Sequence, residues 1–202
     1  MKYISKVAFV IILSLLIFSC DNNEEIISNK DNIVNLKKDK KFIELINNKV
    51  STIENIKDIE KVNYLIEKKE LNENELNELA IALGFSNIND YILYIENEYK
   101  TQNYLDKEYN ISKIEPFDME IIVSETLQSS FQLKSDDCNC ERIRRNCLGE
   151  AFAASVIGHV GCASLDLAVL PGIICHAAVL SAQYFASDNC NANAENCVNN
   201  CN

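Results

Sequence analysis

The chain has 202 residues, 48% of them hydrophobic and 24% charged, so it is neither a disordered polyampholyte nor a multi-pass membrane protein. Its 19 basic and 30 acidic residues give a net charge of -11, which argues against nucleic acid or an anionic membrane held by bulk electrostatics. With nine cysteines but only two histidines and five glycines, any function is expected to lie in the cysteines.

The N-terminus has the pattern of an export signal. Lys2 and Lys6 precede an apolar run, Val7 to Phe18, which is too short for a permanent membrane span and ends at Ser19 and Cys20. This pattern resembles a bacterial lipoprotein signal, which implies a signal peptide over residues 1–19 and a lipidated Cys20. The alternative is ordinary signal cleavage with Cys20 as an unmodified thiol. The acidic residues after Cys20 look like a signal for the outer surface, so we expect a lipidated tether over residues 20–37 and a place at the outer membrane or cell surface.

Residues 38–128 are expected to form a charged helical domain, and the region from Asp21 to Asp137 is expected to fold without the C-terminal module. Apolar residues recur there at steps of three and four, and the segment from Asn72 to Gly84 has an Asn cap, early acids and a final Gly. A further helix is expected from near Asn89 to Tyr104, whereas the segment from Ile114 to Val123 could be a strand or an extended connector. Residues 129–137 are interpreted as a linker. No catalytic spacing stands out from a solvated helical scaffold.

The cysteines divide the chain in two. Apart from Cys20, all eight lie in residues 138–202, where 5 acidic residues face 3 arginines, whereas residues 21–137 hold 25 acidic residues and 14 lysines. An even number of cysteines in an exported chain predicts four disulfides within this module, although 105 pairings are open. The eight are Cys138, Cys140, Cys147, Cys162, Cys175, Cys190, Cys197 and Cys201.

The spacing of the cysteines matches the periodicity of an α-helix. Steps of seven and eleven residues return to nearly the same helix face, so Cys140 and Cys147 are expected to share a face of a first helix. By the same rule Cys190, Cys197 and Cys201 share a face of a last helix. We therefore expect two antiparallel terminal helices joined by disulfides.

Between these helices, the segment from Leu148 to Ala186 is nearly all apolar or small and is interrupted by Pro171 and Gly172, which predicts a helical hairpin. Small residues at Ala154, Gly158 and Cys162 would let two backbones approach closely. This segment is either a buried core held by disulfides or a segment that can enter a membrane.

The sequence gives no strong pattern for a metal site or for catalysis. Zinc could be held by Cys138, Cys140, Cys147 and the pair His159 and Cys162, but the tight spacing of zinc modules is missing, so no metal or cofactor is expected. There is no Cys-x-x-Cys for a thiol oxidoreductase. His159 and His176 lie among Ala, Val and Ile, which favours neutral core histidines over catalytic bases, and no enzyme is expected. The arginines Arg142, Arg144 and Arg145 are either solvated helix charges or a patch that orients the module at lipid headgroups.

The run from Asp137 to Cys147, with its Cys-x-Cys-x6-Cys spacing, resembles the opening of fulvocin C, and the whole layout is similar to the fulvocin C-related bacteriocin family. The hairpin looks more like the haloarchaeal C-type halocins, whose precursors join a helical immunity region to a cysteine-rich toxin. The resemblance implies an exported lipoprotein that is precursor or carrier of a membrane-active module, and it leaves open whether proteolysis releases the module.

The rival hypothesis is a non-toxic surface lipoprotein with a disulfide-rich binding module. The expected partners are a membrane, through the lipid on Cys20 and at the target cell, and an immunity or surface protein. Nucleic acid is not expected as a partner.

Overall fold

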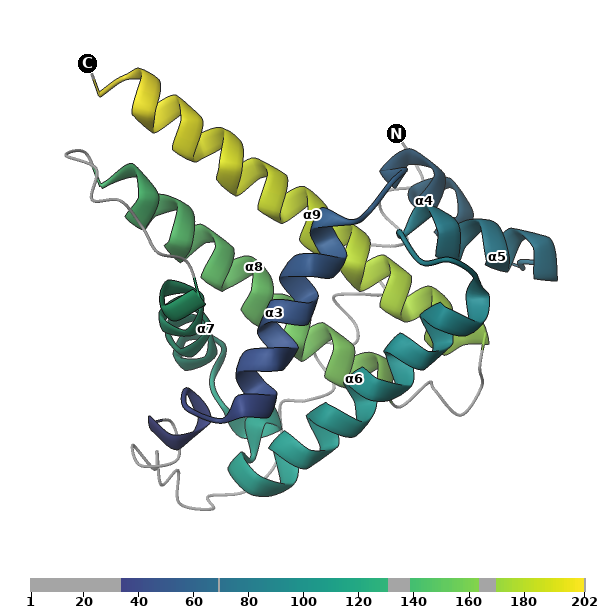
Figure 1. Cartoon of the computed structure of the whole chain (residues 1–202), viewed down its shortest axis with the longest axis horizontal. Coiled ribbons are helices and arrows are strands. Elements are labelled where there is room, and N and C mark those ends of the chain that lie inside the picture. The colour runs from purple at the N-terminus through teal and green to yellow at the C-terminus, as the bar shows by residue number, and fades with distance from the viewer. Residues whose placement is uncertain (1–33, 69, 131–138, 164–169, 202) are drawn as a thin grey trace, which may run out of the picture. The chain divides into compact units, whose positions relative to one another are not determined.

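A computed structural model of the chain describes residues 34–68, 70–130, 139–163 and 170–201 (Figure 1). These residues form helices and turns, with no strand among them, which confirms the prediction of a mainly α fold. Residues 1–33, with the predicted signal peptide and lipidated Cys20, lie outside the described part, as do Cys138 and residues 131–137 of the predicted linker.

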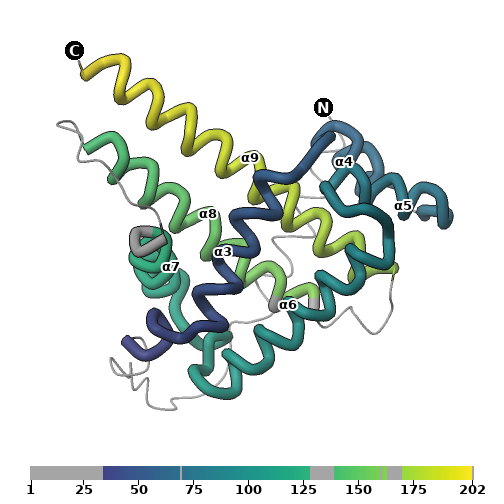
Figure 2. Tube along the Cα trace, in the orientation of Figure 1, coloured from purple at the N-terminus to yellow at the C-terminus, as the bar shows by residue number. Residues whose placement is uncertain are grey.

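Besides the helical residues 34–36, the described part of the first region has six helical elements, which Figure 2 traces in chain order. The elements are α3 (Lys40–Glu54), α4 (Ile59–Ile66), α5 (Glu73–Ala82), α6 (Ile88–Tyr109), the 3-10 helix η1 (Ile111–Lys113) and α7 (Pro116–Ser130).

Local signals explain where α5 begins and ends. The Asn72 side chain accepts a hydrogen bond from the Glu75 backbone N–H, and the Glu75 carboxylate accepts one from the Asn72 backbone N–H. Just after the helix, Gly84 has a φ of +99°, a left-handed conformation that other residues rarely adopt. This capping box and terminal glycine confirm the helix expected between Asn72 and Gly84. The helix expected from Asn89 to Tyr104 is also present, as part of α6.

Three expectations for this region need correction. The segment from Ile114 to Val123 is neither a strand nor a connector beyond Glu115, because Pro116 begins α7, and the first helical position suits proline. Ser129 and Ser130, assigned to the linker, are the last residues of this helix. Leu36, assigned to the tether, is completely buried in the core, because residues 34–36 are helical and pack on the bundle.

The cysteine-rich region is a pair of long helices, α8 (Cys140–Ala163) and α9 (Leu170–Asn199), which lie side by side in Figure 1. This confirms the predicted disulfide-joined helical hairpin. The terminal helices are not separate from the apolar hairpin, since each continues directly into one arm of it. Pro171 and Gly172 lie in the first turn of α9, where proline is tolerated.

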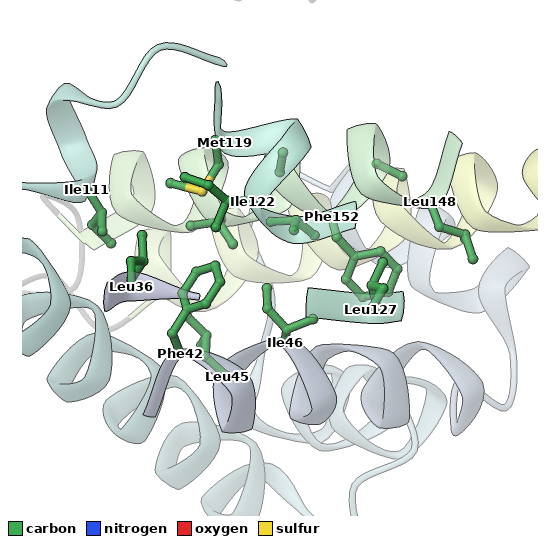
Figure 3. Packing of buried hydrophobic residues seen from close by; sticks show 14 of the residues in the cluster. Leu36, Phe42, Leu45, Ile46, Ile111, Met119, Ile122, Leu127, Leu148 and Phe152 are labelled. Atoms are coloured by element: carbon green, nitrogen blue, oxygen red, sulfur yellow. The ribbon is translucent and has the colours of Figure 1, made fainter. Parts of the chain in front are cut away.

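The two sequence regions share both hydrophobic cores. In the first core, shown in Figure 3, Phe42 and Ile46 of α3 and Leu127 of α7 meet Leu148 and Phe152 of α8. In the second core, side chains from α3, α4, α5 and α6 meet α9 at Ile173, Ala177 and Leu180. Residues 31–202 accordingly form one compact unit, and the expected boundary at residues 129–137 does not separate two of them.

Candidate functional site

Three disulfides join α8 to α9. Cys140 is bonded to Cys197, Cys147 to Cys190 and Cys162 to Cys175, with Cα atoms 5.5 to 5.6 Å apart in each pair. The first two pairs join the helix faces that the spacing predicted. Cys201, expected on a face of the last helix, lies just beyond the end of α9 instead, and it is also disulfide-bonded. Because Cys140, Cys147 and Cys162 are all oxidised, they are not thiolates that could ligate zinc.

The small residues of α8 have different surroundings. A Cβ atom placed on Gly158 would lie 3.1 Å from the Val179 side chain of α9, so the two arms approach closely there, as expected. Cys162 takes part in the disulfide with Cys175, whereas Ala154 is exposed. The stripe therefore serves packing within the hairpin at Gly158 and Cys162.

A cluster of buried ionisable side chains lies where the first region meets the hairpin. We call Lys49, Glu98, His159 and His176, which come from α3, α6, α8 and α9 respectively, the buried charge cluster. All four are at most 4% exposed. The ammonium of Lys49 lies 2.7 Å from Glu98 Oε2, and His159 Nδ1 lies 3.7 Å from the same oxygen. The two histidine rings are stacked, with centroids 4.7 Å apart and their Nδ1 atoms in contact.

Burial controls the protonation of this cluster. It lowers the pKa of Lys49, against the opposing attraction of Glu98. Burial also holds the pKa of His159 well below its usual value, and the charge of Lys49 and the neighbouring His176 add to the effect. The Tyr94 hydroxyl, one turn before Glu98 on α6, has its pKa raised by burial and then by the Glu98 carboxylate. His159 is therefore neutral near neutral pH, as the sequence led us to expect.

Three further polar contacts involve the hairpin. Ser155 Oγ of α8 donates to Gln183 Oε1 of α9 over 2.6 Å. Ser181 Oγ of α9 donates over 2.6 Å to Asn63 Oδ1 of α4, and Tyr91 of α6 donates to the Ile173 carbonyl over 3.3 Å. Two of these hydrogen bonds, like the buried charge cluster, link the first region to the hairpin and add directional contacts to the two apolar cores.

A groove of about 540 Å³ runs between the disulfide-bonded ends of α8 and α9, with Glu141, Arg144, Asn191 and Glu195 in its walls. Arg144 Nε donates to Asn191 Oδ1 over 2.8 Å, and these two residues also line a small adjoining pocket of about 70 Å³. The Ser187 hydroxyl, in the wall of this pocket, is buried and has no hydrogen-bond partner. The groove carries both signs of charge.

Within the described residues, no group of three His, Cys, Asp or Glu side chains is placed to hold a metal ion. One described helix, α9, is long and apolar enough to cross a membrane, with a mean hydropathy of 1.2, and 44% of its apolar window is buried. Buried core helices of soluble proteins meet the same criterion, so this finding agrees with either interpretation of the hairpin.

Sequence reasoning missed Lys49 and Glu98. Both lie at core positions of their helices. Lys49 is on the buried face of α3 with Phe42, Ile46 and Ile53, and Glu98 is on the buried face of α6 between Ile95 and Leu105. The sequence signal for them was a charged residue at a helix position that the apolar spacing assigns to the core. A charged residue is rarely buried unless it is paired, so such a position indicates a buried ion pair.

Comparison of the chain with family models, curated proteins and solved structures gives no match.

Proposed function

We propose that this protein is an exported lipoprotein that carries a membrane-active hairpin in a covered form. The hairpin is α8 and α9, and the cover is α3 to α7. The observation that carries the proposal is the burial of apolar residues of both arms, such as Phe152 and Val156 on α8 and Leu180 on α9, beneath the cover. The resemblance of residues 137–147 to the opening of fulvocin C supports it.

The positions of the disulfides support this proposal. The three disulfides described above all lie within the hairpin, so its two arms stay together if the cover is removed. A disulfide closing a loop of about 15 residues adds roughly 3 kcal/mol by the chain-entropy estimate, and Cys162 and Cys175 are 13 positions apart. A released hairpin would therefore keep its shape while exposing the apolar side chains that the cover had buried.

The driving force for membrane entry would be hydrophobic. From Cys138 onward, 5 acidic residues outnumber 3 arginines, so general attraction to anionic lipid is absent. Arg144 is engaged with Asn191 and, at 3.5 Å, with Glu141, which favours its role as a helix charge over that of a headgroup anchor. The apolar faces of the hairpin are what remains to interact with a bilayer.

The test uses the full-length oxidised protein with a protease site introduced between Lys134 and Ser135. After cleavage, we expect dye to leak from vesicles of zwitterionic phospholipid, whereas the uncleaved protein should release little. Phe185→Lys should weaken leakage without disturbing folding, because Phe185 is an apolar residue of α9 that is 49% exposed. A Lys near the bilayer centre costs about 2.5 to 3.5 kcal/mol.

The matched control is Asn193→Lys, an exposed position in the polar part of α9, which should leave leakage unchanged. If the separated hairpin causes no leakage and kills no related strain, the membrane function is excluded. The second candidate, a surface lipoprotein that binds a protein or glycan, would then be favoured by the groove between α8 and α9 and by the unpartnered Ser187 hydroxyl in its adjoining pocket.

A further inference from the structure

We propose that mild acid separates the cover from the hairpin, and that the buried charge cluster is the place where acid acts. Two of its members, Lys49 and Glu98, belong to the cover, and the two histidines belong to the hairpin. A change of charge in the cluster therefore acts on the contact between these two parts. The consequence, exposure of the apolar hairpin, rests on the proposed function; the opening itself does not.

The acid response depends on His159, whose pKa burial holds well below its usual value, so that it is neutral beside the ion pair of Lys49 and Glu98. Lys49 and Glu98 form a buried ion pair at 2.7 Å. A proton added to His159 would bring a further positive charge close to Lys49, and the single Glu98 carboxylate would face both cations. An unbalanced charge in a buried site is strongly unfavourable, because burial removes the water that would solvate it.

Among the described contacts, the helices around His159 bring one carboxylate to it, that of Glu98. On α6, the other ionisable group nearby is Tyr94, which its raised pKa keeps neutral. Helix α4 meets α9 through Asn63 and Ser181, which are uncharged. Helix α7 packs along α8 through apolar side chains, among them Ile122 and Val123, which share a core with Val156 of α8. Among the contacts that the structure describes, Glu98 is the carboxylate that faces His159.

The direction of the pH dependence follows from His159. Its pKa in the closed protein lies well below 6.5, and in an opened chain the ring regains its ordinary value of about 6.5. The opened form therefore binds the proton more readily, and the closed form loses stability as pH falls below about 6.5 towards the lowered pKa. For one histidine, each pH unit in that window shifts the equilibrium towards the opened form by up to about tenfold.

The experiment measures amide hydrogen exchange along the full-length oxidised chain at about pH 7.5 and about pH 5, corrected for intrinsic exchange rates. At the lower pH we expect α3 and α6 to lose protection by about tenfold or more. The two hairpin arms should lose much less, because the disulfides hold them together.

Lys49→Met provides a test that a merely structural role would not pass. Without the ammonium, Glu98 is free to pair with a protonated His159, so acid should no longer reduce protection, although the variant is less stable near neutral pH. The matched control is Val156→Ala, one turn before His159 on α8, which removes buried apolar atoms and no charge. It should lower protection equally at both pH values.

Equal protection of the unmodified protein at both pH values would overturn the proposal, and so would a full acid effect in Lys49→Met. If Lys49→Met does not fold, His159→Gln takes its place: it removes the titrating ring and should abolish the acid effect. The same samples, assayed on vesicles, separate the two proposals. Acid opening without leakage, even from the cleaved protein, would exclude only the membrane function, whereas leakage after cleavage without acid opening would exclude only the acid response.

Discussion

Two glycines of α8 have opposite surroundings. A Cβ on Gly149 would lie 1.8 Å from Ser124 Oγ and 3.2 Å from the Glu120 carbonyl of α7, whereas a Cβ on Gly161 would meet nothing within 4 Å. We expect Gly149→Ala to lower the free energy of unfolding by about 1–3 kcal/mol through overpacking. Gly161→Ala should raise it by roughly 0.5–1 kcal/mol, because alanine favours the helix. Urea denaturation measures both, and changes of the same sign would contradict the prediction.

Asp39 connects the start of α3 to two tyrosines. Its carboxylate caps the helix and accepts a hydrogen bond from the Tyr109 hydroxyl over 2.9 Å, which with burial and the Asp39 charge raises the pKa of Tyr109 to about 12. Asp39→Asn keeps the cap but removes the charge, so Tyr109 should then titrate closer to 10. NMR signals of the Tyr109 ring, followed against pH and assigned with Tyr109→Phe, check this. Titration near 10 in the unmodified protein would refute it.

At this scale, sequence predicted the neutral state of His159 but not what surrounds the two histidines. Their apolar neighbours along α8 and α9 were visible in the sequence. The ion pair beside them was not, because Lys49 and Glu98 are 49 positions apart and meet only when α3 packs on α6. The candidate site could therefore be predicted on the hairpin side alone.

At the scale of elements, the capping box of α5 offers a matched test. Asn72→Ala removes the side-chain oxygen that accepts from the Glu75 N–H, and should cost about 1 kcal/mol of stability. Asn74→Ala, an exposed position inside the same helix, should be neutral or slightly stabilising, because alanine has the higher helix propensity. Thermal unfolding of both variants by circular dichroism makes the comparison, and equal losses would contradict the role of the cap.

Elements were predictable where the signals were local. Asn72 and Gly84 lie at the ends of their helix and act within a few residues, so the sequence was sufficient there. Pro116 was ambiguous, because proline suits both an extended connector and the first position of a helix. What decides between them is the burial of Met119, Ile122 and Val123 against α3 and α8, which no local pattern specifies.

At the scale of the whole molecule, the change of composition near residue 138 suggested two domains, but both cores draw on both sides of it. Composition reports the chemistry of each segment and not which faces pack together. We expect the oxidised protein to unfold in a single calorimetric transition, because the cover keeps no complete core without the hairpin. Residues 34–130 alone should show no cooperative transition, in contrast to the independent folding expected from sequence. Two resolved transitions in the full chain would contradict this.

The pairing of the cysteines also has a consequence for how the protein is oxidised. The bonds are nested without crossing: Cys162–Cys175 lies inside Cys147–Cys190, which lies inside Cys140–Cys197. The two helical segments between consecutive bonds have equal lengths. Between the innermost and the middle bond each segment spans 15 positions (147 to 162 and 175 to 190), and between the middle and the outer bond each spans 7 (140 to 147 and 190 to 197). Once the innermost bond exists, each outer pair is brought opposite its partner by helices of matched length, and short loops close at the lowest entropic cost. Oxidation can thus proceed from the turn outwards, with each bond selecting the next from among the many pairings that eight cysteines allow.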